Sequence, residues 1–178
     1  NKNKEKDKMK QIRRCLCVVC AFAMLTTIPA YAKTVGIEQY SSVNINSDIL
    51  PSDVGESIDV VQKTPRGVFF SAADLRIENE DGEIGVVGHA YMSEPVDELY
   101  ITIYLDRQIS EGKWEQVDEF EFEFYGEDYP DGLTSELVGF TLTGYPTGHY
   151  YRLRGSYAAV KDGVMEGFGP VTDGVLIQ

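Results

Sequence analysis

The sequence predicts an all-β protein, an antiparallel sandwich of seven to eight strands, and three observations support this prediction. Short runs of alternating apolar and polar residues recur from Gly67 onward. Turn residues interrupt these runs every 8–12 positions or so, a spacing of about the length typical of antiparallel sandwiches. Aromatic and β-branched residues, which favour strands, are frequent in the same region. No stretch there has a convincing helical period.

Turn signals separate the expected strands in order along the chain. The pair Asp81-Gly82 is a tight-turn signal after the first strand, and Glu94-Pro95 ends the second. Further turns are expected at residues 110–112, 129–132, 144–148 and 161–163. The eight expected strands cover residues 68–78, 83–92, 98–107, 114–125, 138–143, 150–160, 164–168 and 174–177.

Two of these strands have the clearest alternation. In residues 98–107, the apolar side chains of every second residue from Leu99 to Leu105 share one face. In residues 114–125, three phenylalanines alternate with three glutamates, which is nearly pure period 2. Each strand is therefore expected to bury one face and to expose the other.

The first 32 residues have the three parts of a secretory signal peptide. Residues 8–14 are cationic, residues 15–25 are apolar, and Ala30 and Ala32 flank Tyr31. A bilayer-spanning helix needs about 20 apolar residues, so this run is too short to span. We expect cleavage after Ala32, export of the mature chain, and an extracellular location with no stable membrane anchor.

Removal of residues 1–32 changes the composition. All three cysteines, Cys15, Cys17 and Cys20, leave with that segment, so no disulfide is expected in the mature domain. Seven of the 16 basic residues and two of the 29 acidic residues also leave, which gives a formal net charge of −18. Polyanions should be repelled by such a chain, so nucleic acid is not an expected partner.

The mature chain is expected to have two parts. Residues 33–65 have scattered apolar side chains without a period, which predicts a flexible N-terminal leader. The sequence leaves open whether a short helix or a short strand forms around residues 58–61. Residues 66–178 are expected to form the β-sandwich.

Residues 142–154, LTGYPTGHYYRLR, resemble the corner of fibronectin type III and immunoglobulin-like domains. In these domains a turn with Gly or Pro precedes an inward-facing tyrosine. The resemblance implies an immunoglobulin-like or fibronectin type III-like sandwich with Tyr151 as the corner tyrosine. Leu153, Gly155 and Tyr157 should then also face the core.

The C-terminal 115 residues or so also resemble a family of small secreted proteins of Gram-positive bacteria whose function is uncharacterised. The likeness lies in residues 104–107, 148–154 and 172–175. It implies the fold and the compartment, and it assigns no activity.

Searches for catalytic and cofactor motifs in the sequence find none. His89 and His149 are far apart and have no i, i+4 partner, so no zinc site is expected. No serine elbow and no phosphate-binding glycine loop is present. The acidic loops at residues 78–83 and 127–132 suit calcium or simple Asx turns equally well. We therefore expect no catalytic residues, no metal ligands and no cofactor.

One sheet face is the best candidate for a binding surface. If strand 98–107 lies between strands 114–125 and 150–160, their outward rows meet. The glutamates at 119, 121 and 123 would then lie near tyrosines and arginines, which either satisfy one another or form an exposed patch for a partner. The predicted binding residues are Tyr100, Tyr104, Tyr150, Arg152 and Arg154.

The sequence thus favours a secreted, non-enzymatic domain that binds an extracellular protein or glycan. The alternative is a secreted hydrolase or a calcium-dependent enzyme whose carboxylates meet only in three dimensions.

Overall fold

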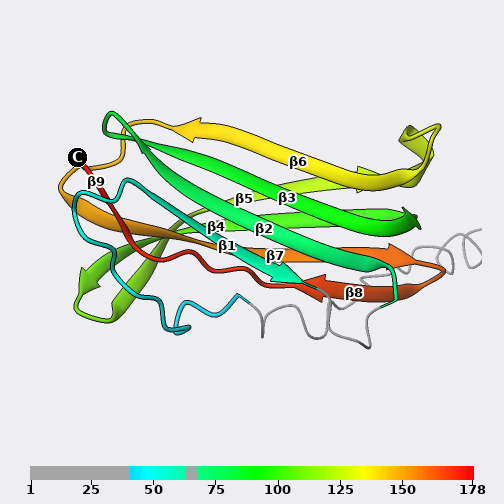
Figure 1. The fold of residues 1–178 in the computed structure, drawn as a ribbon, viewed down its shortest axis with the longest axis horizontal. Helices are drawn as coiled ribbons and strands as arrows, with labels where there is room; N and C mark the ends of the chain where they lie inside the picture. The colour runs from blue at the N-terminus through cyan, green and yellow to red at the C-terminus, as the bar shows by residue number, and fades with distance from the viewer. Residues whose placement is uncertain (1–40, 63–67) are drawn as a thin grey trace, which may run out of the picture. The chain divides into compact units, whose positions relative to one another are not determined.

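The structure is a computed structural model, and it describes residues 41–62 and 68–178. All of them belong to the compact unit Thr34–Gln178. The expected signal peptide, residues 1–32, lies outside the described residues. The described part is all-β, with two antiparallel sheets (Figure 1).

The first sheet has four strands in the order β1-β2-β3-β6. Each neighbouring pair is antiparallel. In Figure 1 this sheet faces the viewer, and β6 lies at its upper edge. Its strands are β1 (Glu56–Gln62), β2 (Phe70–Glu80), β3 (Glu83–Val96) and β6 (Leu133–Leu142).

The second sheet has the order β5-β4-β7-β8, and a fifth strand, β9, also pairs with β7. A short 3₁₀ turn, Gly126–Asp128, follows β5. The strands are β4 (Glu98–Ser110), β5 (Lys113–Tyr125), β7 (His149–Lys161), β8 (Val164–Phe168) and β9 (Val175–Ile177).

Two hairpin turns follow directly from the sequence. Asp81 and Gly82 have φ of 53° and 92°, and Asp162 and Gly163 have φ of 50° and 75°. Two successive residues with positive φ match the right-handed twist of the flanking strands. The predicted Asp-Gly turns are therefore confirmed.

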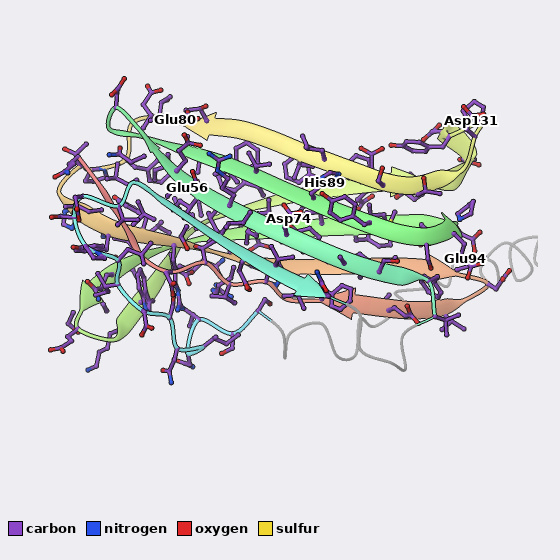
Figure 2. The ribbon with its side chains drawn as sticks, viewed as in Figure 1. Glu56, Asp74, Glu80, His89, Glu94 and Asp131 are labelled. Carbon is purple, nitrogen blue, oxygen red and sulfur yellow. The ribbon has the colours of Figure 1, made fainter. Side chains whose placement is uncertain are left out.

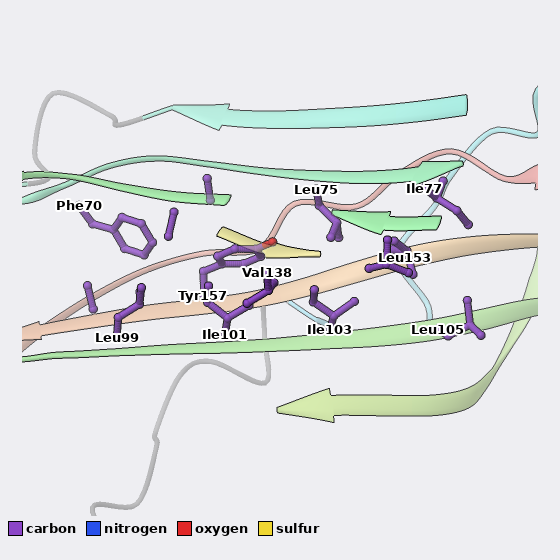
Figure 3. Packing of buried hydrophobic residues seen from close by; sticks show 14 of the residues in the cluster. Phe70, Leu75, Ile77, Leu99, Ile101, Ile103, Leu105, Val138, Leu153 and Tyr157 are labelled. Atoms are coloured by element: carbon purple, nitrogen blue, oxygen red, sulfur yellow. The ribbon is translucent and has the colours of Figure 1, made fainter. Parts of the chain in front are cut away.

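The core lies between the inner faces of the two sheets (Figure 3). Alternate residues of β4, from Leu99 to Leu105, are fully buried, as the period-2 pattern predicted. The hydroxyl of Tyr157 donates to the carbonyl of Asp74, 3.0 Å away, so this buried tyrosine joins the two sheets. Gly88 lies beside it, because a Cβ at residue 88 would approach the Tyr157 hydroxyl oxygen to 2.4 Å.

The structure describes residues 41–62 of the predicted leader, and it has a strand there, one of the two alternatives that the sequence left open around residues 58–61. Residues 56–62 form β1, and Leu50 donates its N–H to the carbonyl of Gly174 at 2.9 Å. The segment takes this structure because β2 of the first sheet and Gly174 near β9 supply partners for its backbone, and local periodicity does not reveal such distant partners. Residues 33–40 and 63–65 lie outside the described ranges.

Candidate functional site

The strands of the predicted binding patch have the expected order, but two of the five predicted side chains are less accessible to solvent than expected. β4 lies between β5 and β7, so Tyr104 is opposite both Glu119 and Arg154. Arg154 also lies over the Tyr104 ring, 4.7 Å from its centroid. However, Arg152 and Arg154 are 0% and 1% exposed. The expectation that these two arginines lie on an exposed patch is therefore wrong.

Both arginines pair with a buried carboxylate, that of Asp106. Asp106 accepts Nε of Arg152 at 3.0 Å and Nε and Nη2 of Arg154 at 2.7 and 3.0 Å. Asp106 is itself 0% exposed. Buried ionic groups of this kind depend on mutual pairing, because each charge has lost its hydration. Burial lowers the pKa of the Arg152 guanidinium, and the Asp106 charge opposes that shift.

The segment before β1 covers this cluster. Nη1 and Nη2 of Arg152 donate to the carbonyls of Ile45 and Val43 at 2.7 and 2.8 Å. The Trp114 ring lies 4.5 Å from the guanidinium carbon of Arg152. We call Asp106, Arg152 and Arg154 the buried ionic cluster. Its observed contacts anchor residues 43–45 to the second sheet.

The three tyrosines of the predicted patch are half-buried. The Tyr100 hydroxyl donates to Glu98 at 2.6 Å, and that bond is the main reason that the Tyr100 pKa is raised. Burial raises the pKa of Tyr104. A binding role for Tyr100, Tyr104 and Tyr150 stays a prediction.

The corner residues face the core as predicted. Tyr151, Leu153 and Tyr157 are each 0% exposed. The Tyr151 hydroxyl donates to the carbonyl of Pro146, five residues upstream, at 2.8 Å.

The outer face of the first sheet has a group of exposed apolar side chains that the sequence analysis did not single out. The exposed fractions are 55% for Ile58, 53% for Val60, 57% for Leu137 and 38% for Tyr91. They come from β1, β3 and β6. We call these four residues the apolar face. The alternation of inward and outward residues in each strand could have indicated these exposed side chains. Ile58 and Val60, however, lie in the stretch that the sequence predicts to be a leader.

Polar residues cross the middle of this face. Asp74 is opposite Val60 on one side and His89 on the other, and His89 is opposite Leu137. Figure 2 shows Asp74 and His89 between β1 and β6. The Tyr91 hydroxyl and His89 Nδ1 are hydrogen-bonded, and the two rings are 3.9 Å apart between centroids. Burial, followed by the charge of Asp74, raises the pKa of Tyr91.

Beside the apolar face, the sheet surface has a shallow hollow of about 240 Å³. Its floor includes Gly85 and Gly139, which have no side chains to fill the space. Glu80 lies across Gly85 and accepts a hydrogen bond from the Thr141 hydroxyl at 2.8 Å. The complete lining is Arg76, Glu78, Glu80, Gly85, Val86, Val87, Gly139, Phe140 and Thr141.

Metal ligands do not gather anywhere in the part of the chain that the structure describes. Within residues 41–62 and 68–178, no group of three or more His, Cys, Asp and Glu side chains has the arrangement to hold an ion. No helix in these ranges is long and apolar enough to cross a bilayer.

Comparison with known proteins shows a relative of this chain. No family model matches the chain. The uncharacterised protein MJ0756 of Methanocaldococcus jannaschii is 31% identical over 148 residues, which are 82% of this chain and 90% of the archaeal protein. The chain belongs to the family of MJ0756. The name of that relative assigns no activity to the MJ0756 family.

Among solved structures, Spo0M, a sporulation control protein from Bacillus subtilis, is similar with a TM-score of 0.32 and 10% identity. The match covers 70% of this chain and spans half the length of the Spo0M chain. Similarity at this level does not establish a shared fold with the MJ0756 family.

Proposed function

We propose that this protein is a secreted, non-enzymatic domain that binds an extracellular protein through the apolar face of its first sheet. The observation that carries the proposal is the exposure of Ile58, Val60, Tyr91 and Leu137 on one side of three strands. Exposed apolar side chains interspersed with polar groups are a feature of protein interaction sites. Asp74 and His89 supply polar groups within that surface.

A protein partner fits this face better than a glycan does. Three of the four exposed side chains are aliphatic, and such groups pack against apolar side chains of a partner. Stacking on a sugar needs a free aromatic ring face, and the Tyr91 ring already packs against His89.

Export supports an extracellular partner. The signal peptide at residues 1–32 is a prediction from the sequence, and so is the likeness to small secreted proteins of Gram-positive bacteria. The absence of cysteine after residue 32 is consistent with a bacterial exported domain that relies on its core.

We also infer an immunoglobulin-like or fibronectin type III-like sandwich. The order β2-β3-β6 in one sheet and β5-β4-β7-β8 in the other supports this inference, because it has the connections of the three-on-four arrangement in those domains. The Tyr151 bond to Pro146 supports it further. In this interpretation β1 is an added edge strand, and β8 and β9 share the place of the last strand.

A triple variant tests the binding role. Ile58→Thr, Val60→Thr and Leu137→Thr together remove apolar area and keep residues that suit strands. Cell-surface and culture material from the source organism is passed over the immobilised full chain, and the partner that is retained is identified and purified. The triple variant should bind the purified partner at least about tenfold more weakly, because interface cores contribute most of the binding energy.

A matched control uses exposed apolar residues of the second sheet. Ile109, Val164 and Met165 are 57%, 58% and 43% exposed, and their replacement by Thr should leave the affinity unchanged. Both triple variants should keep the native melting temperature within a few degrees. Equal binding by the native chain and the apolar-face variant would refute the proposal.

A further inference from the structure

Within residues 41–62 and 68–178, the strand β6 is an edge strand with little protection against pairing. It forms one border of the first sheet and has β3 as its neighbour. In its ten residues, LTSELVGFTL, Glu136 is the one charge, and neither Pro nor Lys is present. Natural sheets usually protect such an edge with charges, prolines or bulges, because its free backbone groups can pair with another strand.

The other long edges of the two sheets differ from β6. Next to β1, the Val171 N–H donates to Asp59 at 2.8 Å and the Asp173 N–H donates to the Ser57 hydroxyl at 2.9 Å. At the edge of the second sheet, β5 contains five carboxylates, whereas β6 contains one. Side-chain bonds therefore protect β1, and charges protect β5.

The hollow lies next to this open edge. Gly139 and Thr141 of β6 pair with Val87 and Gly85 of β3, and all four residues line it. A strand added to β6 would lie about 4.8 Å away. A long side chain opposite Gly139 would then extend over the glycine into the hollow.

Charge indicates which side chain fits the hollow. Glu78 and Glu80 lie at its wall, and Arg76 bonds to Glu78 at 2.6 Å and to Glu56 at 2.9 Å. Glu56 and Glu78 bind the Arg76 guanidinium and Glu80 does not, so these three carboxylates and one guanidinium carry a formal net charge of −2. The floor of glycine and Val87 suits an aliphatic stem. A lysine or arginine has both parts, an apolar stem and a cationic end.

We propose that β6 pairs with an extended segment of a partner protein, which adds a fifth strand to the first sheet and places a lysine or arginine in the hollow. This inference rests on the proposed protein-binding function and specifies its mode. Main-chain hydrogen bonds to β6 supply affinity, and the basic side chain supplies selectivity. The apolar face lies next to the added strand, where Leu137 contacts its apolar residues.

A second copy of the chain fits this edge less well. Antiparallel pairing of two β6 strands would bring together two copies of Glu136 and two hollows with excess negative charge. The chain also has a formal net charge of −13, so two copies repel each other.

Peptide titration of the isotope-labelled full chain tests the proposal. The probe is acetyl-Thr-Val-Thr-Lys-Thr-Val-Thr-amide, and its control has Gln in place of Lys. The lysine peptide should shift the amide resonances of Leu137, Gly139, Thr141 and Gly85 in a saturable way. The glutamine peptide should bind about threefold to tenfold more weakly, because it lacks the charge-assisted bonds.

Two variants of the hollow sharpen the test. In Gly139→Val, the new Cβ has ordinary contacts of 3.8 and 3.9 Å, so the side chain fills the hollow without a backbone clash. Glu80→Gln removes one wall charge and keeps the shape. Both variants should bind the lysine and glutamine peptides equally. Glu121→Gln, a charge control on β5, should keep the native preference for lysine.

The outcomes separate this inference from the proposed function. Equal binding of the two peptides by the native chain, or lysine-dependent shifts spread over the acidic residues of β5, would overturn it. A dimer in sedimentation equilibrium that Leu137→Lys dissociates would overturn it in favour of a second copy. If the natural partner is lost with the apolar-face variant but kept with Gly139→Val and Glu80→Gln, the protein-binding function stands and the strand-addition mode fails.

Discussion

At the scale of single residues, Asp106 supplies the negative charge that pairs with both buried arginines. It accepts hydrogen bonds from both arginines of the buried ionic cluster, and all three residues are shielded from water. Arg152 in turn bonds to the backbone at residues 43 and 45. The cluster thus links a residue of β4, two residues of β7 and the segment before β1.

Replacement of Asp106 should therefore destabilise the domain strongly. Asp106→Ala leaves two buried guanidiniums without a counter-charge, and loss of one partner of a buried ion pair costs about 3–5 kcal/mol. Urea unfolding, followed by the fluorescence of Trp114, measures the change. Glu121→Ala, an exposed carboxylate of β5, should change stability by less than about 0.5 kcal/mol. A similar small effect for Asp106→Ala would contradict the assigned role.

The residue scale is also where sequence reasoning was least complete. The alternation of β7 placed Arg152 and Arg154 on the outer side of the sheet correctly, and the pairing with β4 was correct as well. Their burial depends on Asp106, Trp114 and residues 43–45, which come from three distant segments. Period-2 patterns report which face a side chain takes, but they do not report what covers that face.

At the scale of elements, the strands of the domain were predictable because each has a local pattern and local turn signals. Val164–Phe168 has the bounds that the sequence predicted, and the other strands differ from their predicted bounds by a few residues. The sequence does not decide between a helix and a strand at β1, because Glu56–Gln62 exposes Ile58 and Val60 on the side that would ordinarily be polar. Side-chain bonds to residues 171 and 173 contribute to its place in the sheet.

These side-chain bonds make β1 a testable element. The double change Ser57→Ala and Asp59→Ala removes both acceptors for the N–H groups of Val171 and Asp173. We expect the amides of β1 to exchange with solvent at least about tenfold faster, since each lost bond contributes on the order of 1 kcal/mol. Hydrogen exchange read by mass spectrometry gives the rates.

The control for this change is the interior of β2 and β4, where exchange should stay slow. Unchanged exchange in β1 would mean that its pairing with β2 is sufficient to hold it. Equal acceleration in all strands would mean that β1 unfolds with the whole domain rather than on its own.

At the scale of the whole molecule, half-buried Tyr145 and buried Tyr157 link the stability of the fold to alkaline pH. Burial, together with the bond to Asp118, raises the pKa of Tyr145 to about 12 from its ordinary 10.0. Burial raises that of Tyr157 as well. In the unfolded chain both phenols lose their protons near pH 10, whereas in the folded chain they keep them. Stability should therefore be retained below pH 10 and should fall as pH rises above it.

Melting temperatures between pH 8 and about 12 check this dependence. Tyr145→Phe removes one of the tyrosines with a raised pKa, so the fall of stability with pH should become shallower. Exposed Tyr125 offers the comparison, since its pKa is also raised, mainly by its bond to Glu123, but it is not buried. Tyr125→Phe should alter the slope less than Tyr145→Phe does. The same slope in the native chain and in Tyr145→Phe would contradict the assignment.

Different kinds of contact join the two sheets along the two sides of the sandwich, and this difference affects how the sheets can move relative to each other. Directional hydrogen bonds join β1 to residues 171–173 on one side. On the other, the Phe140 ring packs against Phe120 and Phe122 at 5.0 and 5.7 Å, so apolar contacts bridge β5 and β6. Ring contacts tolerate sliding that hydrogen bonds resist. We therefore expect the two sheets to hinge about residues 171–173. The change in their separation should be largest beside β6.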